Sequence, residues 1–189
     1  MAERLSPLTR FTPVSSDDLR IAEVPFLAQV NLRVDAKGRA AGDIGLALGA
    51  PLPTEPGTCV STDVDVLWLG PDEWLVIGEA GTERALEARL REAAGTEHVA
   101  VTDVSAQRTA LLVAGPRARD LLAHGCALDL HPRQFGPGRS AQTMLARAQV
   151  VLVARDGDEF LVLVRSSFAG YLAEWLADAA AEYVSGQQG

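Results

Sequence analysis

The stretch "DEFLVLVRSSFAGYLAEWLADAA" (Asp158–Ala180) repeats an earlier stretch of the same chain, "DEWLVIGEAGTERALEARLREAA" (Asp72–Ala94). The two align without a gap, 86 positions apart, and eight of the 23 aligned positions are identical. Their apolar positions coincide. In each copy a short apolar run predicts a strand, and leucines at helical spacing predict the helix that follows. The chain therefore contains one structural unit twice.

Each copy extends toward the N-terminus into a second strand, which makes the repeated unit a β-hairpin followed by a helix. The first copy covers 64–94 and the second covers 150–180. A hairpin buries its apolar side only when another layer packs against it, and the following helix supplies that layer. The predicted fold class is therefore α+β, with repeated hairpin–helix units, mixed or antiparallel sheets, and helices packed to one side.

The rest of the chain predicts one folded domain between an N-terminal arm and a C-terminal tail. Residues 1–20 are polar, contain Pro7 and Pro13, and predict an N-terminal arm. We expect a single compact α+β domain over 21–184 and a frayed tail over 185–189. Within the domain, residues 19–35 read as one strand. The segments 98–104 and 107–115 read as a second hairpin joined by a tight turn.

The composition excludes several classes of partner. The chain has 189 residues and a net charge of −8, and its sixteen arginines and one lysine form no basic run, so we expect no nucleic-acid partner. The apolar runs are short and interrupted by charge, which predicts no membrane span. Cys59 and Cys126 lie far apart without metal-ligand spacing, and no signal peptide is evident. These features predict a cytoplasmic protein.

No catalytic motif is present. The sequence lacks a G-x-G-x-x-G loop, a phosphate-binding G-x-x-x-x-G-K-[ST] loop and a G-x-S-x-G elbow. The three histidines, His98, His124 and His131, have no metal-ligand spacing. We therefore predict no catalytic, cofactor-binding or metal-binding residue in this chain.

Two arginines form the first candidate partner contact. Arg117 and Arg119 lie at the expected start of a helix, where the helix dipole disfavours cations. Together with the free backbone N–H groups there, they could receive a carboxylate or phosphate. That anion would be a ligand or an acidic side chain of another protein. The alternative is that both are solvated surface arginines.

Three aromatic residues form the second candidate. Phe168, Tyr171 and Trp175 of the second copy stand where the first copy has Thr82, Ala85 and Arg89. The shared leucines already fill the core face, so the aromatics add a flank to the apolar stripe. They pack inside the domain or face another protein. Trp175 is the best single candidate for a partner contact, because its counterpart Arg89 is expected to be exposed.

Four segments give the chain a family resemblance. They are "LGPDEWL" (Leu69–Leu75), "DVSAQRTALLVAGPRARDLLAHGCALDLHP" (Asp103–Pro132), "AQTMLARAQVVL" (Ala141–Leu152) and "VRSSFAGYLAEWL" (Val164–Leu176). In this order they resemble the gamma subunits of heterotetrameric sarcosine oxidases, over about 11–183. The segment "AGPRARDLL" also resembles, more distantly, the folate-binding aminomethyltransferases that include the glycine-cleavage T-protein.

This resemblance implies a fold like the folate-binding domain of the T-protein and a place in an enzyme complex. In such complexes sarcosine is oxidatively demethylated to glycine, with formation of hydrogen peroxide and 5,10-methylenetetrahydrofolate. The implied partners are the alpha, beta and delta subunits. The resemblance assigns FAD, FMN, NAD, zinc and tetrahydrofolate to those subunits and no cofactor to this one. Whether the chain counts as an enzyme by itself is left open.

A second hypothesis is an independent folate-binding or one-carbon-transfer protein of the T-protein-like family. It would need a pocket with a carboxylate placed to meet the pterin ring. No motif of the T-protein's catalytic apparatus falls on a numbered residue here, so no catalytic residue is transferred.

Overall fold

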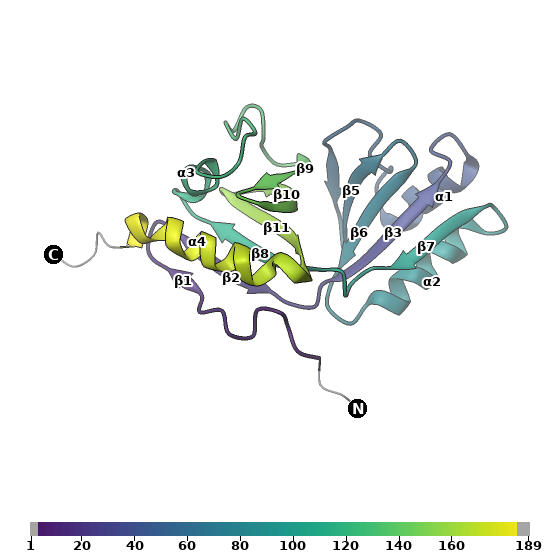
Figure 1. Ribbon diagram of the computed structural model, residues 1–189. Helices are drawn as coiled ribbons and strands as arrows, with labels where there is room; N and C mark the ends of the chain where they lie inside the picture. Colours follow the sequence, from purple (N-terminus) through teal and green to yellow (C-terminus); the bar gives the residue numbers. More distant parts are fainter. Residues whose placement is uncertain (1–3, 185–189) are drawn as a thin grey trace. The chain divides into compact units, whose positions relative to one another are not determined.

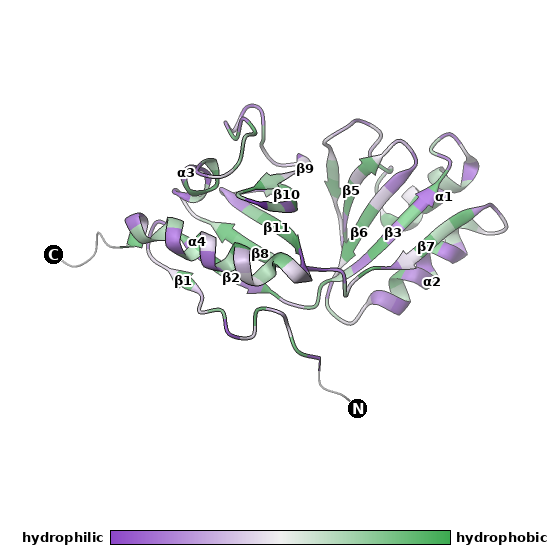
Figure 2. Cartoon of the chain, in the orientation of Figure 1, coloured by the Kyte–Doolittle hydropathy of each residue, from purple (hydrophilic) through white to green (hydrophobic). Residues whose placement is uncertain are grey.

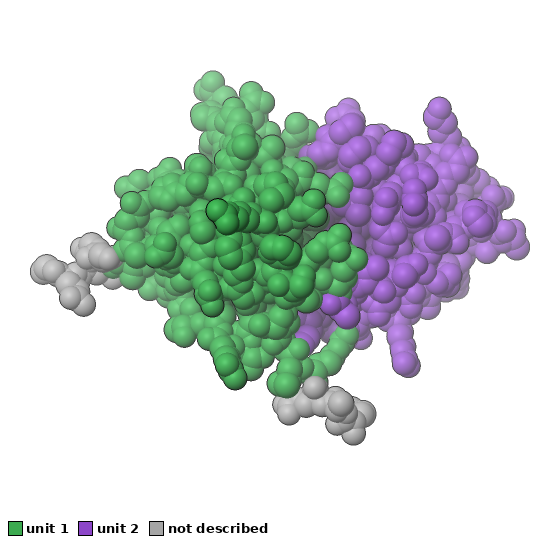
Figure 3. Space-filling view, in the orientation of Figure 1, with its two compact units in different colours: residues 1–25, 107–189 green, residues 26–106 purple. Residues whose placement is uncertain are grey.

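The computed structural model describes residues 4–184, and the predicted tail over 185–189 lies outside this range. Contacts divide the chain into two compact units (Figure 3). The first unit combines residues 1–25 with 107–189, and the second is formed by 26–106. Whether both act as the one compact domain expected over 21–184 stays a prediction.

The first unit contains a six-stranded antiparallel sheet (Figure 1). Its strand order is β1 (Val14–Ser15), β2 (Arg20–Val24), β8 (Arg108–Ala114), β11 (Glu159–Arg165), β10 (Ala148–Arg155) and β9 (Ser140–Leu145). The helices α3 (Ala118–Ala123) and α4 (Ala169–Val184) pack on one face, with a single 3₁₀ turn, η1 (Ser166–Phe168), before α4. In the expected arm over 1–20, β1 pairs with β2, and Leu8 and Leu19 are buried in this core.

The second unit contains a five-stranded antiparallel sheet. Its strand order is β4 (Cys59–Ser61), β5 (Asp65–Gly70), β6 (Glu73–Gly78), β3 (Ala28–Val34) and β7 (Val99–Asp103). The helices α1 (Arg39–Leu48) and α2 (Glu83–Ala94) share one hydrophobic cluster with β3, β5, β6 and β7. Figure 2 shows the same pattern in both units: the strands are mostly apolar, and polar residues lie on the helices.

The predicted α+β class with repeated hairpin–helix units is confirmed. The first copy forms β5, β6 and α2, and the second forms β10, β11 and α4. Strand register is repeated as well, since Leu67 pairs with Leu75 as Val153 pairs with Leu161. The counterparts Trp74 and Phe160 are both fully buried. The shared sequence therefore encodes the same hairpin geometry and the same core position.

The duplication extends beyond the stretch visible in the sequence. The order β4-β5-β6-β3-β7 in one sheet is matched by β9-β10-β11-β8-β2 in the other. The strand β2, from the start of the chain, thus takes the place that β7 takes in the second unit. Each unit is one copy of the same element order, and the first unit obtains its last strand from the N-terminal end.

Two sequence predictions were wrong for a common reason. Residues 19–35 form two strands, β2 and β3, which belong to different sheets and are separated at Pro25 and Phe26, where Phe26 has a φ of 61°. The segments expected to form a second hairpin are β7 and β8, which also belong to different sheets. In both places the chain passes from one unit to the other, and each strand pairs with a strand distant in sequence.

Candidate functional site

The polar residues of the described chain, 4–184, form no group of three or more His, Cys, Asp or Glu side chains that could hold a metal ion. Two of the three histidines have local partners. His124 lies 3.1 Å from the Tyr183 hydroxyl and 3.2 Å from Glu182. The His131 ring accepts a hydrogen bond from the backbone N–H of Arg133. Across 4–184, no helix is both long and apolar enough to span a membrane.

The two candidate arginines do not form a common receptor, because they make separate contacts. Arg117 is the N-cap of α3, and its half-exposed side chain pairs with Asp120 at 2.9 Å. This hydrogen bond raises the pKa of the Arg117 guanidinium further above its usual value. These contacts are those expected of a solvated surface arginine, which was the alternative interpretation of Arg117.

Arg119 is the more buried of the two, with a side chain only 16% exposed. Its Nε donates to Asp158 at 2.8 Å, and its Nη1 donates to the carbonyl oxygens of Leu130 and Phe135. The guanidinium also lies 4.8 Å from the centre of the Phe160 ring. Arg119 therefore ties the crossover loop after α3 to the β10–β11 turn, through donors on its Nε and Nη1 atoms.

The three candidate aromatics fall into two environments. Phe168 and Tyr171 are 45% and 39% exposed and contact each other edge to face, with ring centres 6.4 Å apart. Trp175 packs against the core of the first unit, and a Cβ added at Gly125 would lie 2.7 Å from its ring. Its role as a partner contact stays a prediction, and the side chain is partly buried against the core of its own unit.

The counterpart of Trp175 is not the exposed residue that the sequence suggested. The Arg89 side chain is 33% exposed, its Nε donates to the Ala47 carbonyl at 3.0 Å, and it pairs with Asp63. The Arg89 hydrogen bond lowers the pKa of the Asp63 carboxyl. Arg89 thus reaches the last turn of α1, much as Trp175 reaches Gly125 just past α3. In both copies the side chain at this position therefore connects the second helix of its unit to the C-terminal end of the first.

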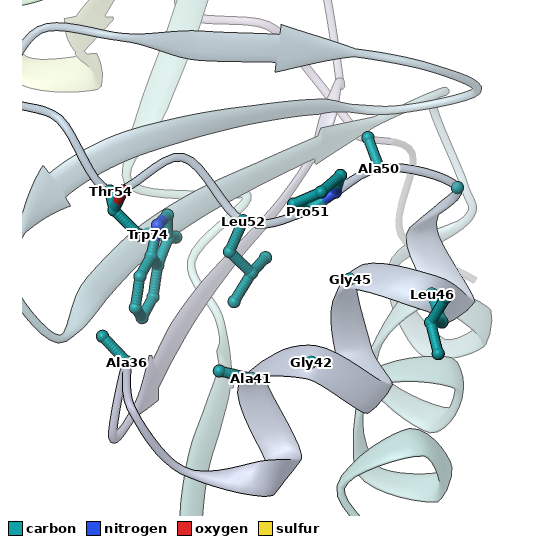
Figure 4. Close-up of a pocket in the computed structure, with 11 residues that line it drawn as sticks. Ala36, Ala41, Gly42, Gly45, Leu46, Ala50, Pro51, Leu52, Thr54 and Trp74 are labelled. Carbon is teal, nitrogen blue, oxygen red and sulfur yellow. The ribbon is translucent and has the colours of Figure 1, made fainter.

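One feature of the second unit was missed by sequence reasoning. A hollow of about 540 Å³ lies between α1 and the segment that follows it, with Trp74 at one end (Figure 4). It is lined by Ala36, Ala41, Gly42, Gly45, Leu46, Gly49, Ala50, Pro51, Leu52, Thr54 and Trp74. Leu46 is 82% exposed, and a Cβ added at Gly42 would have nothing within 4 Å. The sequence feature that falls on this hollow is the pair of glycines inside α1, Gly42 and Gly45.

The comparisons with known proteins agree with this architecture. Residues 33–182 match the model of the sarcosine oxidase, gamma subunit family. The chain is 38% identical over 166 residues to the sarcosine oxidase subunit gamma of Corynebacterium sp. (strain U-96), covering 86% of this chain and 80% of that one. It also matches, with a TM-score of 0.88 and 33% identity over 98% of this chain and 99% of the other, a chain in the structure of heterotetrameric sarcosine oxidase from Corynebacterium sp. U-96 in complex with pyrrole 2-carboxylate.

A more distant match bears on the fold alone. The glycine cleavage system aminomethyltransferase T from Bartonella henselae matches with a TM-score of 0.64 and 16% identity. The match covers 82% of this chain but only 44% of that protein. The expected likeness to the T-protein fold is therefore confirmed, and it shows nothing about transfer chemistry.

Proposed function

The chain belongs to the sarcosine oxidase gamma subunit family, and on this premise we propose that it is a non-catalytic subunit of a heterotetrameric sarcosine oxidase. The observation that supports this most is the end-to-end structural match to a chain of such a complex. The match covers 98% of this chain and 99% of that one. We place the complex in the cytoplasm, with alpha, beta and delta subunits as the partners.

In this proposal the complex demethylates sarcosine oxidatively to glycine, with hydrogen peroxide and 5,10-methylenetetrahydrofolate as further products. FAD, FMN, NAD, zinc and tetrahydrofolate belong to the other subunits. This chain contributes a folded surface to the complex and no catalytic group. The contacts of Arg119 and of the two histidines described above favour such a role, because these groups bond to neighbouring residues of the chain and do not converge on a pocket.

Co-purification from the native host tests the proposal. We expect an affinity-tagged copy of the chain to bring down flavin-containing larger subunits in a complex that oxidises sarcosine, whereas the isolated chain should produce no hydrogen peroxide from sarcosine. Flavin absorbance and a peroxide assay measure both. Recovery of the chain without any flavoprotein, or sarcosine turnover by the chain alone, would refute the assignment. Saturable calorimetric binding of tetrahydrofolate to the isolated chain would favour the folate-binding alternative.

We expect Phe168 and Tyr171 to contact another subunit. Exposed aromatic pairs are typical anchors, because they bury a large area on binding at low entropic cost. Replacing both by serine should weaken assembly by about 2 kcal/mol or more, which is roughly thirtyfold or more in affinity. Analytical size exclusion of the reconstituted complex at graded concentration measures the change.

The control variant for this pair is Val184→Ser, which alters an exposed apolar residue at the other end of α4. It should leave assembly intact. Circular dichroism should show both variants folded, since neither aromatic residue belongs to the buried core. If the double variant assembled as well as the control, the prediction that Phe168 and Tyr171 contact another subunit would be refuted.

A further inference from the structure

The hollow beside α1 has a counterpart in the first unit, because the two units repeat one element order. The strands that precede α1 and α3, which are β3 and β8, hold the same place in their sheets. The stretch "AGDIG" (41–45) of α1 therefore corresponds to "ARDLL" (118–122) of α3. In both stretches the first, fourth and fifth residues are buried and the third is an aspartate. Gly42 thus stands where the first unit has Arg119.

In the first unit, the side chain at this position spans three elements. The Arg119 guanidinium lies 4.8 Å from the centre of the Phe160 ring. Its Nη1 donates to the carbonyl oxygens of Leu130 and Phe135, in the segment that follows the helix. One arginine side chain therefore fills the space between the helix, the buried ring and the following segment.

In the second unit, the corresponding three elements border the open hollow. Trp74, the counterpart of Phe160, lies at one end of it, and the segment that follows α1 forms one side (Figure 4). A Cβ added at Gly42 would have nothing within 4 Å. Among residues 4–184, no group donates a hydrogen bond to the carbonyl oxygen of Ala50 or of Leu52, and both residues line the hollow. The second unit thus has the ring and the carbonyl oxygens but lacks the arginine.

The charge of the second unit favours a cationic occupant. Residues 26–106 contain thirteen acidic and six basic residues, whereas the first unit contains twelve acidic and eleven basic ones. The second unit therefore carries nearly all of the net charge of −8. Glu55, which follows the lining residue Thr54, is exposed and forms no ion pair with the rest of 4–184. A negative field of this kind attracts a cationic group before contact.

We propose that the hollow is the docking site for an arginine side chain of another subunit, which takes the place that Arg119 takes in the first unit. Its aliphatic stem covers the apolar wall that includes the exposed Leu46, and its planar guanidinium donates to the carbonyl oxygens of Ala50 and Leu52. The volume of about 540 Å³ exceeds that of one arginine side chain, so apolar neighbours of this arginine enter with it. Because the partner is a subunit of the complex, this inference rests on the proposed function.

The first arm of the test fills the hollow from within the chain. Gly42→Arg adds the side chain that the first unit has at this position, and the open space there accepts it. We expect this variant to fold and to bind the flavin-containing subunits about tenfold or more weakly, in a titration of the reconstituted complex. Gly42→Ala is the matched control, because it replaces the same glycine but leaves the hollow open. It should assemble like the parent chain.

A third variant covers the case in which Gly42→Arg does not fold. Leu46→Ser changes a side chain that is 82% exposed and lies outside both core clusters, so its melting temperature should equal that of the parent chain. It removes part of the apolar wall of the hollow. We therefore expect it to weaken assembly as well, and size exclusion at graded concentration measures the change.

The second arm uses the isolated full chain and does not depend on the identity of the complex. The probe is N-acetylarginine methylamide, followed by nuclear magnetic resonance at the indole N–H of Trp74. We expect saturable shifts that Gly42→Arg abolishes and Gly42→Ala preserves. The lysine analogue of the probe should bind about threefold or more weakly, because a single ammonium group cannot serve two carbonyl oxygens as a planar guanidinium does.

The two arms separate this proposal from the proposed function. If the parent chain brings down no flavoprotein, the proposed function fails, and the comparison of the arginine and lysine probes alone decides whether the hollow accepts a guanidinium. Weakened assembly of Gly42→Arg or Leu46→Ser, together with preferred binding of the arginine probe, supports the docking site. The proposal is overturned if both variants assemble like the parent chain, or if the arginine probe binds no better than the lysine probe.

Discussion

Replacing Trp74 by alanine is expected to lower the free energy of unfolding by about 3–5 kcal/mol, because the largest fully buried side chain of the second unit would be removed. The indole packs in the cluster shared by α1, α2 and four strands. Its Nε1 donates to the Pro53 carbonyl at 2.7 Å, which holds the segment after α1 over the sheet. The melting temperature should fall by on the order of 10 °C, as followed by circular dichroism.

A second tryptophan provides a matched control for the hydrogen bond. Trp68 lies directly opposite Trp74 in the β5–β6 register, and its buried Nε1 has no hydrogen-bond partner among residues 4–184. Trp74→Phe should cost about 1–3 kcal/mol, since it removes a satisfied donor. Trp68→Phe should cost less, because only an unsatisfied donor is lost. Equal destabilisation by the two substitutions would show that the Pro53 contact contributes nothing.

The sequence predicted the fold class where the pattern was local. Leu86 and Leu90 recur as Leu172 and Leu176, and helical spacing alone places all four on a buried face. Each hairpin of the repeat is closed by a short turn, so its strands pair with neighbours in sequence. Local periodicity and short turns therefore sufficed to predict the hairpin–helix unit twice.

The errors lie where strand pairing is non-local. The register joins β2 to β8, although these strands are more than eighty residues apart, and it joins β7 to β3. A window over 98–115 contains two good strands and a short connection, which together favour a hairpin. Nothing within that window shows that each strand has a better partner elsewhere. The duplication itself indicates that the two strands belong to different sheets, since β7 ends one copy of the repeated unit and β8 begins the next.

The environments of the candidate contact residues depend on non-local packing as well. Spacing predicted one flank for Phe168, Tyr171 and Trp175, but it could not show that the missing side chain of Gly125 leaves room for the Trp175 ring. The position of Arg119 near a helix start was also correct. Its acceptors, the carbonyls of Leu130 and Phe135, lie in a loop whose path no periodicity predicts.

Arg119→Ala is the substitution expected to destabilise the first unit most among its charged residues. It removes hydrogen bonds to two carbonyl oxygens, an ion pair with Asp158 and a cation–π contact with Phe160. Hydrogen bonds from a charged donor and a partly desolvated cation–π contact each contribute about 1–3 kcal/mol and do not add fully. We expect a loss of about 2–4 kcal/mol in the free energy of unfolding, measured by urea denaturation.

Two further variants separate this internal role from a role at a subunit surface. Arg119→Lys keeps the charge but cannot reproduce the planar fork that serves Asp158 and the loop carbonyls together, so its stability should fall between those of the parent chain and Arg119→Ala. Arg117→Ala should leave the urea midpoint nearly unchanged, because the ion pair of its half-exposed side chain with Asp120 is exposed to solvent. If Arg119→Ala left stability intact and weakened assembly instead, the guanidinium would act at a partner surface, and the loop contacts seen here would not be what holds 130–135 in place.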